Sequence, residues 1–197
     1  MSVKNIIWFI PVMIGLYGCP YEANVPLAAR PAEAVDTNLV GYWYGIVKDG
    51  SDFFGIEALD ISPKTDSTYS IIRYGKAIKG DIILPDTAYF TGYTSFVGPQ
   101  RFMNIEGTLV IEEPRGKKEK RVTTQKIFYL AALDRAHDTL DIRTVTENFT
   151  ARKSFGRPED LNAMVNDLLH NKKQNIFDDQ YNLKYRRIPR PGNQSQH

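Results

Sequence analysis

Three histidines are the residues of this chain that could supply a base for nucleophilic catalysis: His137, His170 and His197. A serine or cysteine nucleophile needs such a base within hydrogen-bond reach. His137 falls in a predicted hairpin turn, His170 at the end of a predicted helix, and His197 is the last residue. None follows a nucleophile elbow, so the sequence indicates no catalytic triad.

Paired carboxylates are the second source of chemistry. Glu57 together with Glu106 or Asp141 could hydrolyse a glycosidic bond if the two carboxyl groups faced one cavity. Any β-protein of this size offers such pairs. A carboxylate-dependent hydrolase is therefore an alternative here and not the leading hypothesis.

The sequence gives even less support for a metal or cofactor site than for a carboxylate pair. Asp178 and Asp179 are adjacent, but neighbouring residues of a strand point to opposite faces, and a turn before the last strand explains both. Clustered metal ligands and glycine-rich phosphate loops are missing from the sequence. We expect no metal and no cofactor.

Cys19 is the single cysteine of the chain, and it directly follows an apolar run. Residues 6–18 (IIWFIPVMIGLYG) carry no charge, and Lys4 precedes them. This run is too short to span a bilayer, which takes about 20 apolar residues, but it suits the apolar region of a secretory signal. We expect export.

The residues LYGC, at positions 16–19, resemble the lipobox of bacterial lipoproteins. Leu16 and Gly18 match that pattern, whereas Tyr17 is bulkier than usual. The resemblance implies cleavage before Cys19 and acylation of its sulfur and nitrogen, which anchors the protein in a membrane by more than one chain. Pro20, in place of the aspartate that retains lipoproteins in an inner membrane, favours the outer membrane of a Gram-negative cell. The alternatives are an incidental thiol after a signal anchor and a plain secretory signal cleaved elsewhere.

The rest of the chain divides by composition. Residues 19–38 are rich in proline and alanine without periodicity and are predicted to form a lipidated tether between lipid and domain. The domain is expected over residues 39–188, and residues 189–197 as a flexible tail. The formal net charge of +2 falls to +1 once Lys4 leaves with the signal peptide, so no nucleic-acid surface is indicated.

Within the domain, alternation with period two predicts a mainly β fold. Eight short segments, rich in aromatic and β-branched residues, are bounded by turn residues: 39–47, 54–62, 67–78, 87–97, 101–113, 124–136, 139–149 and 180–188. They predict an antiparallel meander, and closure into a barrel would remove its exposed edges. A barrel of eight strands either fills with side chains or holds one small ligand.

One amphipathic helix is expected before the last strand. Pro158 suits a first helical position, Asn171 is a plausible stop, and an apolar stripe runs from Leu161 to Leu169. The stripe indicates packing against the sheet or over one end of the barrel. Recruitment of a partner is the alternative.

The motif GYWYG, residues 41–45, resembles the Gly-x-Trp signature on the first strand of lipocalins and related barrels. The resemblance implies that Trp43 closes one end of the barrel and that an arginine of the last strand packs over its ring. Arg187 shares a face with Leu183 and Tyr185 and is favoured for that role over Arg186. The alternative is a core tryptophan in an unrelated β-domain.

Four aromatic residues, Tyr89, Tyr93, Phe96 and Phe102, are the candidates for lining an apolar pocket, although aromatic residues at strand spacing can also be simple core. Together these patterns predict a membrane-anchored, lipocalin-like lipoprotein. We expect it to bind a small apolar ligand, or to serve as an envelope accessory module, without catalysis. A structural lipoprotein that docks on an unknown envelope partner is the main alternative.

Overall fold

The computed structural model describes residues 21–49, 52–79, 82–115, 119–146, 154–171 and 175–190. These residues form one helix, α1 (Pro158–Asn171), and nine strands: β1 (Glu22–Ala23), β2 (Gly41–Asp49), β3 (Asp52–Pro63), β4 (Tyr69–Lys79), β5 (Ile82–Val97), β6 (Gln100–Arg115), β7 (Glu119–Ala136), β8 (Thr139–Val145) and β9 (Phe177–Ile188). The signal sequence and Cys19 lie outside the described residues, as does most of the predicted tail.

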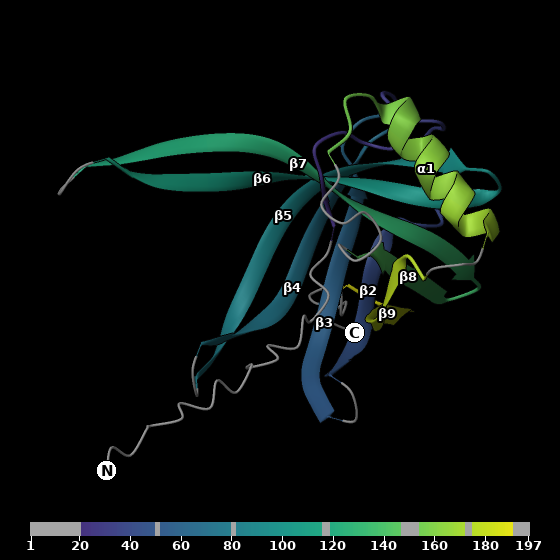
Figure 1. Ribbon diagram of the computed structural model, residues 1–197. Helices are drawn as coiled ribbons and strands as arrows, with labels where there is room; N and C mark the ends of the chain where they lie inside the picture. The colour runs from purple at the N-terminus through teal and green to yellow at the C-terminus, as the bar shows by residue number, and fades with distance from the viewer. Residues whose placement is uncertain are drawn as a thin grey trace, which may run out of the picture.

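Strands β2 to β9 form a closed antiparallel barrel (Figure 1). Each strand pairs with the next in the sequence, and β9 pairs with both β8 and β2 to complete the ring. The predicted meander of eight strands and its closure are confirmed. Closure satisfies the backbone donors and acceptors that an open sheet would leave at its two edges.

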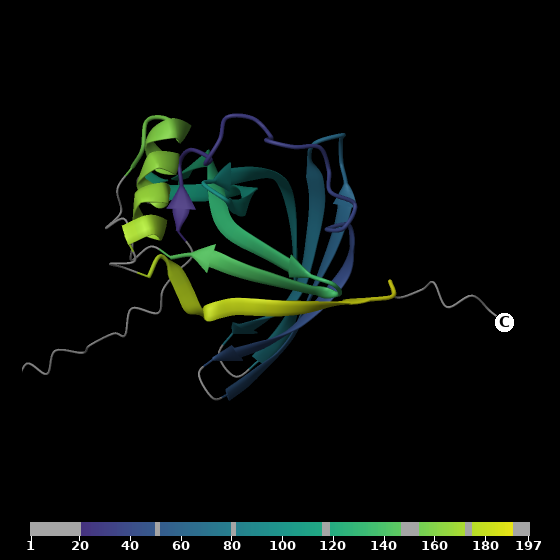
Figure 2. The same ribbon diagram turned by 90° about the vertical axis from the view of Figure 1, so that its right-hand side faces the viewer.

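The predicted helix is also present, and it lies beside the barrel wall (Figure 2). Leu161 and Val165, one turn apart, are fully buried and pack in one cluster with Val97, Phe102 and Phe128 from β5, β6 and β7. Glu159 and Asp160 lie in the first turn, where the partial positive charge of the helix dipole favours them. The helix therefore covers the outer face of the wall.

Residues 21–38 differ from the predicted tether. Strand β1 pairs with β7, and Tyr21, Ala23 and Leu27 are at most 4% exposed. The segment then continues over one end of the barrel to β2 (Figure 2). The composition of this segment predicted a solvated linker. Its few apolar side chains instead pack against strands that are far away in the sequence. The described part of this segment belongs to the folded domain.

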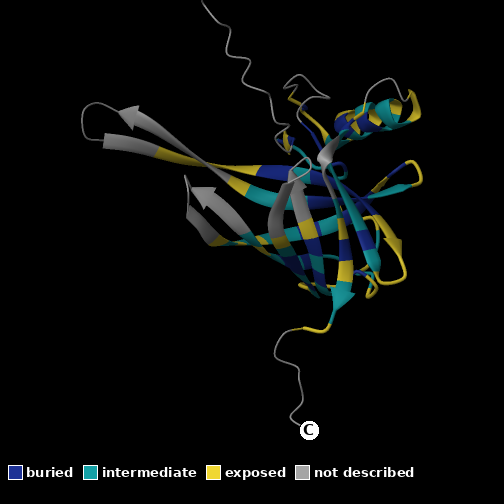
Figure 3. Cartoon of the chain, turned by 90° about the horizontal axis from the view of Figure 1, so that it is seen from below, coloured by how far each residue is buried: buried dark blue, intermediate teal, exposed yellow. Residues whose placement is uncertain are grey.

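Because side chains alternate along each strand, they divide between two cores, one under α1 and one inside the barrel. On β7, Phe128, Leu130 and Ala132 point outward to the helix cluster, whereas Ala131 and Leu133 point into the barrel. Residues 130–133 of β7 are accordingly all buried, and Figure 3 shows buried and intermediate residues along the barrel strands. Because both faces of this wall are covered, burial alone does not tell the inside of the barrel from its outside.

One hairpin projects well beyond the barrel (Figure 1). Strands β6 and β7 pair with each other as far as Arg115 and Glu119, whereas β5 accompanies β6 only as far as Glu106. We name residues 107–115 and 119–127 the arm. Within the described residues the arm has no third strand beside it.

Candidate functional site

The barrel contains a cavity of about 490 Å³ that is partly open to the outside. This is within the size range of small-molecule sites, which is about 300–1,000 Å³. Its apolar wall is mainly aliphatic and comes from seven barrel strands, β3 to β9, and from the segment just before β2: Leu39, Leu59, Ile61, Ile71, Phe90, Met103, Ile105, Ala131, Leu133, Leu140, Ile142 and Leu183. An apolar molecule would exchange water for these side chains there, which is favourable in proportion to the apolar area that it buries.

Six side chains with polar groups interrupt this wall: Glu22, Glu57, Arg73, Tyr129, Thr144 and Tyr185. Three of them, Glu57 of β3, Arg73 of β4 and Tyr185 of β9, are joined by hydrogen bonds. The Tyr185 hydroxyl donates to Glu57 Oε1 at 2.5 Å, and Arg73 Nη1 donates to Glu57 Oε2 at 3.1 Å. Arg73 Nη2 also donates to the carboxylate of Asp86. We name Glu57, Arg73, Tyr185 and Asp86 the polar cluster.

The ionisation of Tyr185 is suppressed in this cluster. Burial raises the pKa of Tyr185 well above its ordinary value, and the neighbouring negative charge of Glu57 raises it further. Because the phenol stays protonated, it can donate to Glu57 at any pH near neutrality. The cluster therefore holds its hydrogen bonds with Tyr185 neutral and Glu57 as the acceptor.

Trp43, near the start of β2, and Arg187, near the end of β9, lie at one end of the barrel. They are direct partners in the β2–β9 ladder, and the guanidinium carbon of Arg187 lies 4.8 Å from the centroid of the Trp43 ring. Trp43 is fully buried, and its Nε1 donates to the Leu39 carbonyl at 2.9 Å. Arg187 donates to the carbonyls of Asn38 and Val40. This end is closed by packing and hydrogen bonds together.

Both glycines of the GYWYG motif lie where a side chain would come close to a neighbouring residue. A Cβ on Gly41 would lie 3.3 Å from Arg187 Nε, and the backbone φ of +150° at this residue favours glycine. A Cβ on Gly45 would lie 3.0 Å from the ring of Tyr185. The two glycines thus make room for the arginine over Trp43 and for the tyrosine of the polar cluster.

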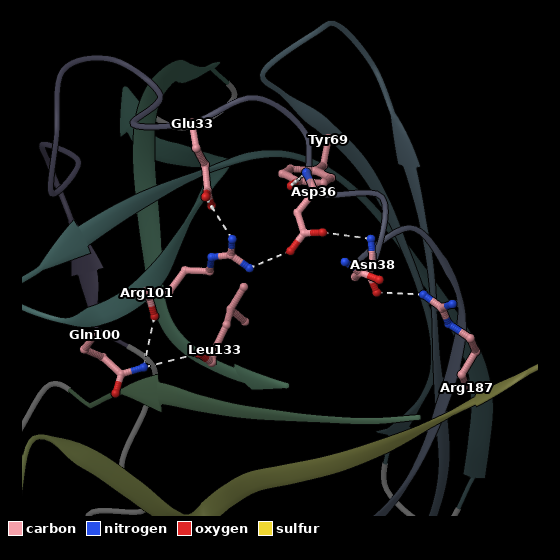
Figure 4. A network of polar contacts seen from close by, with 8 residues as sticks. All are labelled: Glu33, Asp36, Asn38, Tyr69, Gln100, Arg101, Leu133 and Arg187. Carbon is pink, nitrogen blue, oxygen red and sulfur yellow. Dashed lines mark hydrogen bonds and ion pairs between the residues drawn. The ribbon is translucent and has the colours of Figure 1, made fainter. Parts of the chain in front are cut away.

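A clasp of ion pairs holds the N-terminal segment across the closed end (Figure 4). Arg101 bonds Glu33 and Asp36, each at 2.8 Å, and the Asp36 N–H donates to the Tyr69 hydroxyl at 2.7 Å. Burial by itself would raise the pKa of Asp36, but the hydrogen bonds from Arg101 and Asn38 and the charge of Arg101 together outweigh burial and lower that pKa. The charged form of Asp36 is therefore the one that the fold stabilises.

The four aromatic residues proposed from the sequence lie elsewhere than on the cavity wall. Tyr89 and Phe96 are 75% and 42% exposed. Tyr93 donates to the Ala28 carbonyl at 2.6 Å, and Phe102 packs in the helix cluster. The aromatic residue of β5 that does line the cavity is Phe90, next to Tyr89 in the sequence.

The carboxylate pairs considered for hydrolysis are not brought together. Glu57 lines the cavity, whereas Glu106 and Asp141 are absent from its wall. Glu106 instead pairs with Lys126 at 2.8 Å, and Asp141 lies 4.0 Å from Lys184. A second carboxylate that lines the cavity, Glu22, comes from β1, a strand that the sequence did not predict.

The remaining candidates are scattered. His137 lies in the β7–β8 turn, and His170 Nδ1 donates to the Asn166 carbonyl at 2.8 Å on the exposed side of α1. Asp178 and Asp179 belong to β9, and His197 lies outside the described residues. Over the described part of the chain, no three histidine, cysteine, aspartate or glutamate side chains are grouped to hold a metal ion.

Sequence reasoning missed Arg73, Tyr185 and Glu22. A signal for the first two exists, because Arg73 shares its strand face with Ile71, and Tyr185 shares its face with Leu183, and all four line the cavity. A charged side chain on the apolar face of a strand marks a polar group inside the barrel.

Comparison with known proteins returned no matching family model, no matching characterised protein and no matching solved structure. In the described residues, α1 is also too short and too polar to cross a membrane. The site must therefore be judged from its own geometry.

Proposed function

We propose that this protein is a membrane-anchored lipoprotein whose barrel binds a small ligand with an apolar body, without catalysis. The observation that carries the proposal is the cavity of about 490 Å³, which has an aliphatic wall and a single polar cluster. Ligand sites commonly combine an apolar lining with a few polar groups that fix orientation. The carboxylate pairs considered for hydrolysis, Glu57 with Glu106 or Asp141, do not face the cavity together, because of these three only Glu57 is on its described wall, and this supports binding over hydrolysis.

Filling the cavity tests the binding function. In Ala131→Phe, a ring occupies space on the cavity wall, since Ala131 points inward from β7. We expect the affinity for the apolar fluorophore N-phenyl-1-naphthylamine to fall at least about tenfold, because its apolar contacts are lost. Fluorescence titration of the chain that begins at residue 19, with Cys19 replaced by serine, measures this.

Tyr89→Ala is the control for that titration, because Tyr89 is 75% exposed. It should leave the affinity within about twofold of the parent chain. Urea unfolding of both variants checks that the fold is retained. Absence of fluorophore binding to the folded parent chain would contradict the proposed function.

The anchor has a separate basis. The described structure begins at Tyr21, whose N–H donates to the Val145 carbonyl at 2.8 Å. Two residues span at most about 7 Å, so acylation of Cys19 would hold the barrel directly at a membrane surface. With Pro20 after Cys19, we propose the outer membrane as the site in a Gram-negative cell.

Cys19→Ala tests the anchor. We expect the precursor to stay uncleaved by the lipoprotein peptidase and unlabelled by a palmitate analogue, because the acylated sulfur is gone. Metabolic labelling followed by gel electrophoresis of the membrane fraction measures both effects. Labelling equal to that of the parent protein would show that Cys19 is not the acylated residue.

Docking on an envelope protein is the second candidate function, and the arm favours it. Strands β6 and β7 leave their outer backbone edges without a neighbour over residues 107–115 and 119–127 in the described structure. An extended segment of a partner can add to such an edge by backbone hydrogen bonds. Cross-linking from the arm in intact cells that repeatedly recovers one stoichiometric partner would favour this function.

A further inference from the structure

We propose that the cavity selects amphiphiles with a positively charged polar end, such as an ammonium group on an apolar body. This inference rests on the proposed ligand-binding function and names the chemical class of the ligand. It comes from the charges on the cavity wall and from the way in which they are paired.

The charges facing the cavity are predominantly negative. Glu22, Glu57 and Arg73 are the charged residues of its wall, and Asp86 bonds Arg73 from beside it. The wall and Asp86 thus carry three carboxylates against one guanidinium, and Arg73 bonds two of them, Glu57 and Asp86. In a barrel interior with reduced dielectric, this excess of negative charge favours a cation over an anion of the same shape.

The guanidinium that could bind an anionic amphiphile is already paired with carboxylates. Arg73 is the only cationic residue of the described cavity wall, and it bonds both Glu57 and Asp86. A ligand carboxylate would have to compete with these two attached carboxylates. It would also lie beside Glu57, and like charges at such a site oppose ionisation of one another.

A cationic ligand would find unused acceptors. Two carboxylate oxygens offer about four lone-pair sites, and Glu57 uses one on each oxygen, for Tyr185 and for Arg73. Glu22 accepts a long hydrogen bond of 3.4 Å from the Tyr129 hydroxyl. An ammonium group has three donors and could therefore bond Glu57, or Glu22, without displacing Arg73.

Aromatic rings add to the same preference. Phe90 and Tyr129 both line the cavity, and their rings meet edge to face with centroids 6.4 Å apart. The face of an aromatic ring attracts a cation through its quadrupole and does not attract an anion. The rings and the carboxylates thus favour the same ligand charge.

Three probes of equal chain length test the selection: decylamine, decan-1-ol and decanoate. At pH 7 the amine is cationic and the acid anionic, since their pKa values resemble those of lysine and glutamate side chains. Isothermal titration of the chain that begins at residue 19, with Cys19 replaced by serine, should show decylamine binding at least about tenfold more tightly than decanoate, with decan-1-ol between them.

Glu57→Gln should reduce the ratio between the amine and the acid at least about fivefold, because it removes one negative charge but keeps an acceptor for Tyr185. Glu106→Gln is the matched control, since Glu106 is absent from the cavity wall, and it should keep the ratio of the parent chain. Equal binding of all three probes, or tighter binding of decanoate, would overturn the charge selection and leave ligand binding intact. Absence of binding by every probe, with the chain folded, would overturn the proposed function itself.

Discussion

Trp43→Ala should lower the free energy of unfolding by about 3–5 kcal/mol, the range found when a buried aromatic residue is truncated to alanine. Trp43 is fully buried at the closed end, and its Nε1 donates to the Leu39 carbonyl. Its removal leaves a cavity, an unpaired carbonyl and an arginine without its ring. Urea unfolding of the chain from residue 19, followed by circular dichroism, measures the change.

Two arginine variants separate the packing of Trp43 from the role of the guanidinium above it. Arg187→Met should cost about 1–3 kcal/mol, because the carbonyls of Asn38 and Val40 lose a charged donor. Arg186→Met is the matched control, since Arg186 is the exposed neighbour on the same strand. It should change the free energy of unfolding by no more than about 0.5 kcal/mol. Equal effects of the two arginine variants would contradict the assigned closure of the barrel.

Asn104→Ala is expected to have the second largest effect, a loss of about 2–4 kcal/mol. Asn104 is fully buried, its Oδ1 accepts from the Leu27 N–H at 2.7 Å, and its Nδ2 donates to Ser95 Oγ at 2.8 Å. Each buried group left without a partner costs about 1–3 kcal/mol. Urea unfolding measures the loss, and proteolysis within residues 21–38 should become faster because the variant releases this segment from β6.

Asn171→Ala provides the comparison for Asn104. Asn171 is exposed at the end of α1, where its side chain bonds only Asp167 among the contacts described. We expect a change within about 0.5 kcal/mol and an unaltered proteolysis pattern. If Asn104→Ala changed the free energy of unfolding as little as Asn171→Ala, apolar packing alone would hold the N-terminal segment against the barrel.

The strands and the helix could be predicted because their signals are local. Period-two alternation, turn residues and an apolar stripe are all set by neighbours in the sequence, and the barrel follows from them once edges must be closed. The contact between Trp43 and Arg187 was expected from a motif and from the face shared by alternate residues. These inferences need no knowledge of what covers each face of the sheet.

The packing of residues 21–38 could not be predicted, for the opposite reason. Tyr21, Ala23 and Leu27 share the spacing of one strand face, but the stretch is short and contains Pro26, and their partners lie on β6, β7 and β8. The same difficulty affected the pocket residues. Tyr89 and Phe90 are equally aromatic, and the register of β5 in the barrel decides that Phe90 faces the cavity while Tyr89 is exposed.

The closure of the barrel also determines when the domain can fold. Strand β9 completes the ring with β2, so the first and last barrel strands of the chain must meet before Trp43 can be enclosed. The N-terminal segment, although it is made first, must wait for β6 and β7 to supply its pockets. Contacts of such long range make folding slow, in the range of milliseconds to seconds for comparable β-proteins. The barrel therefore cannot close until nearly all of the polypeptide has been synthesised. A chain that ends before β9 would leave two barrel edges exposed, and exposed strand edges promote aggregation.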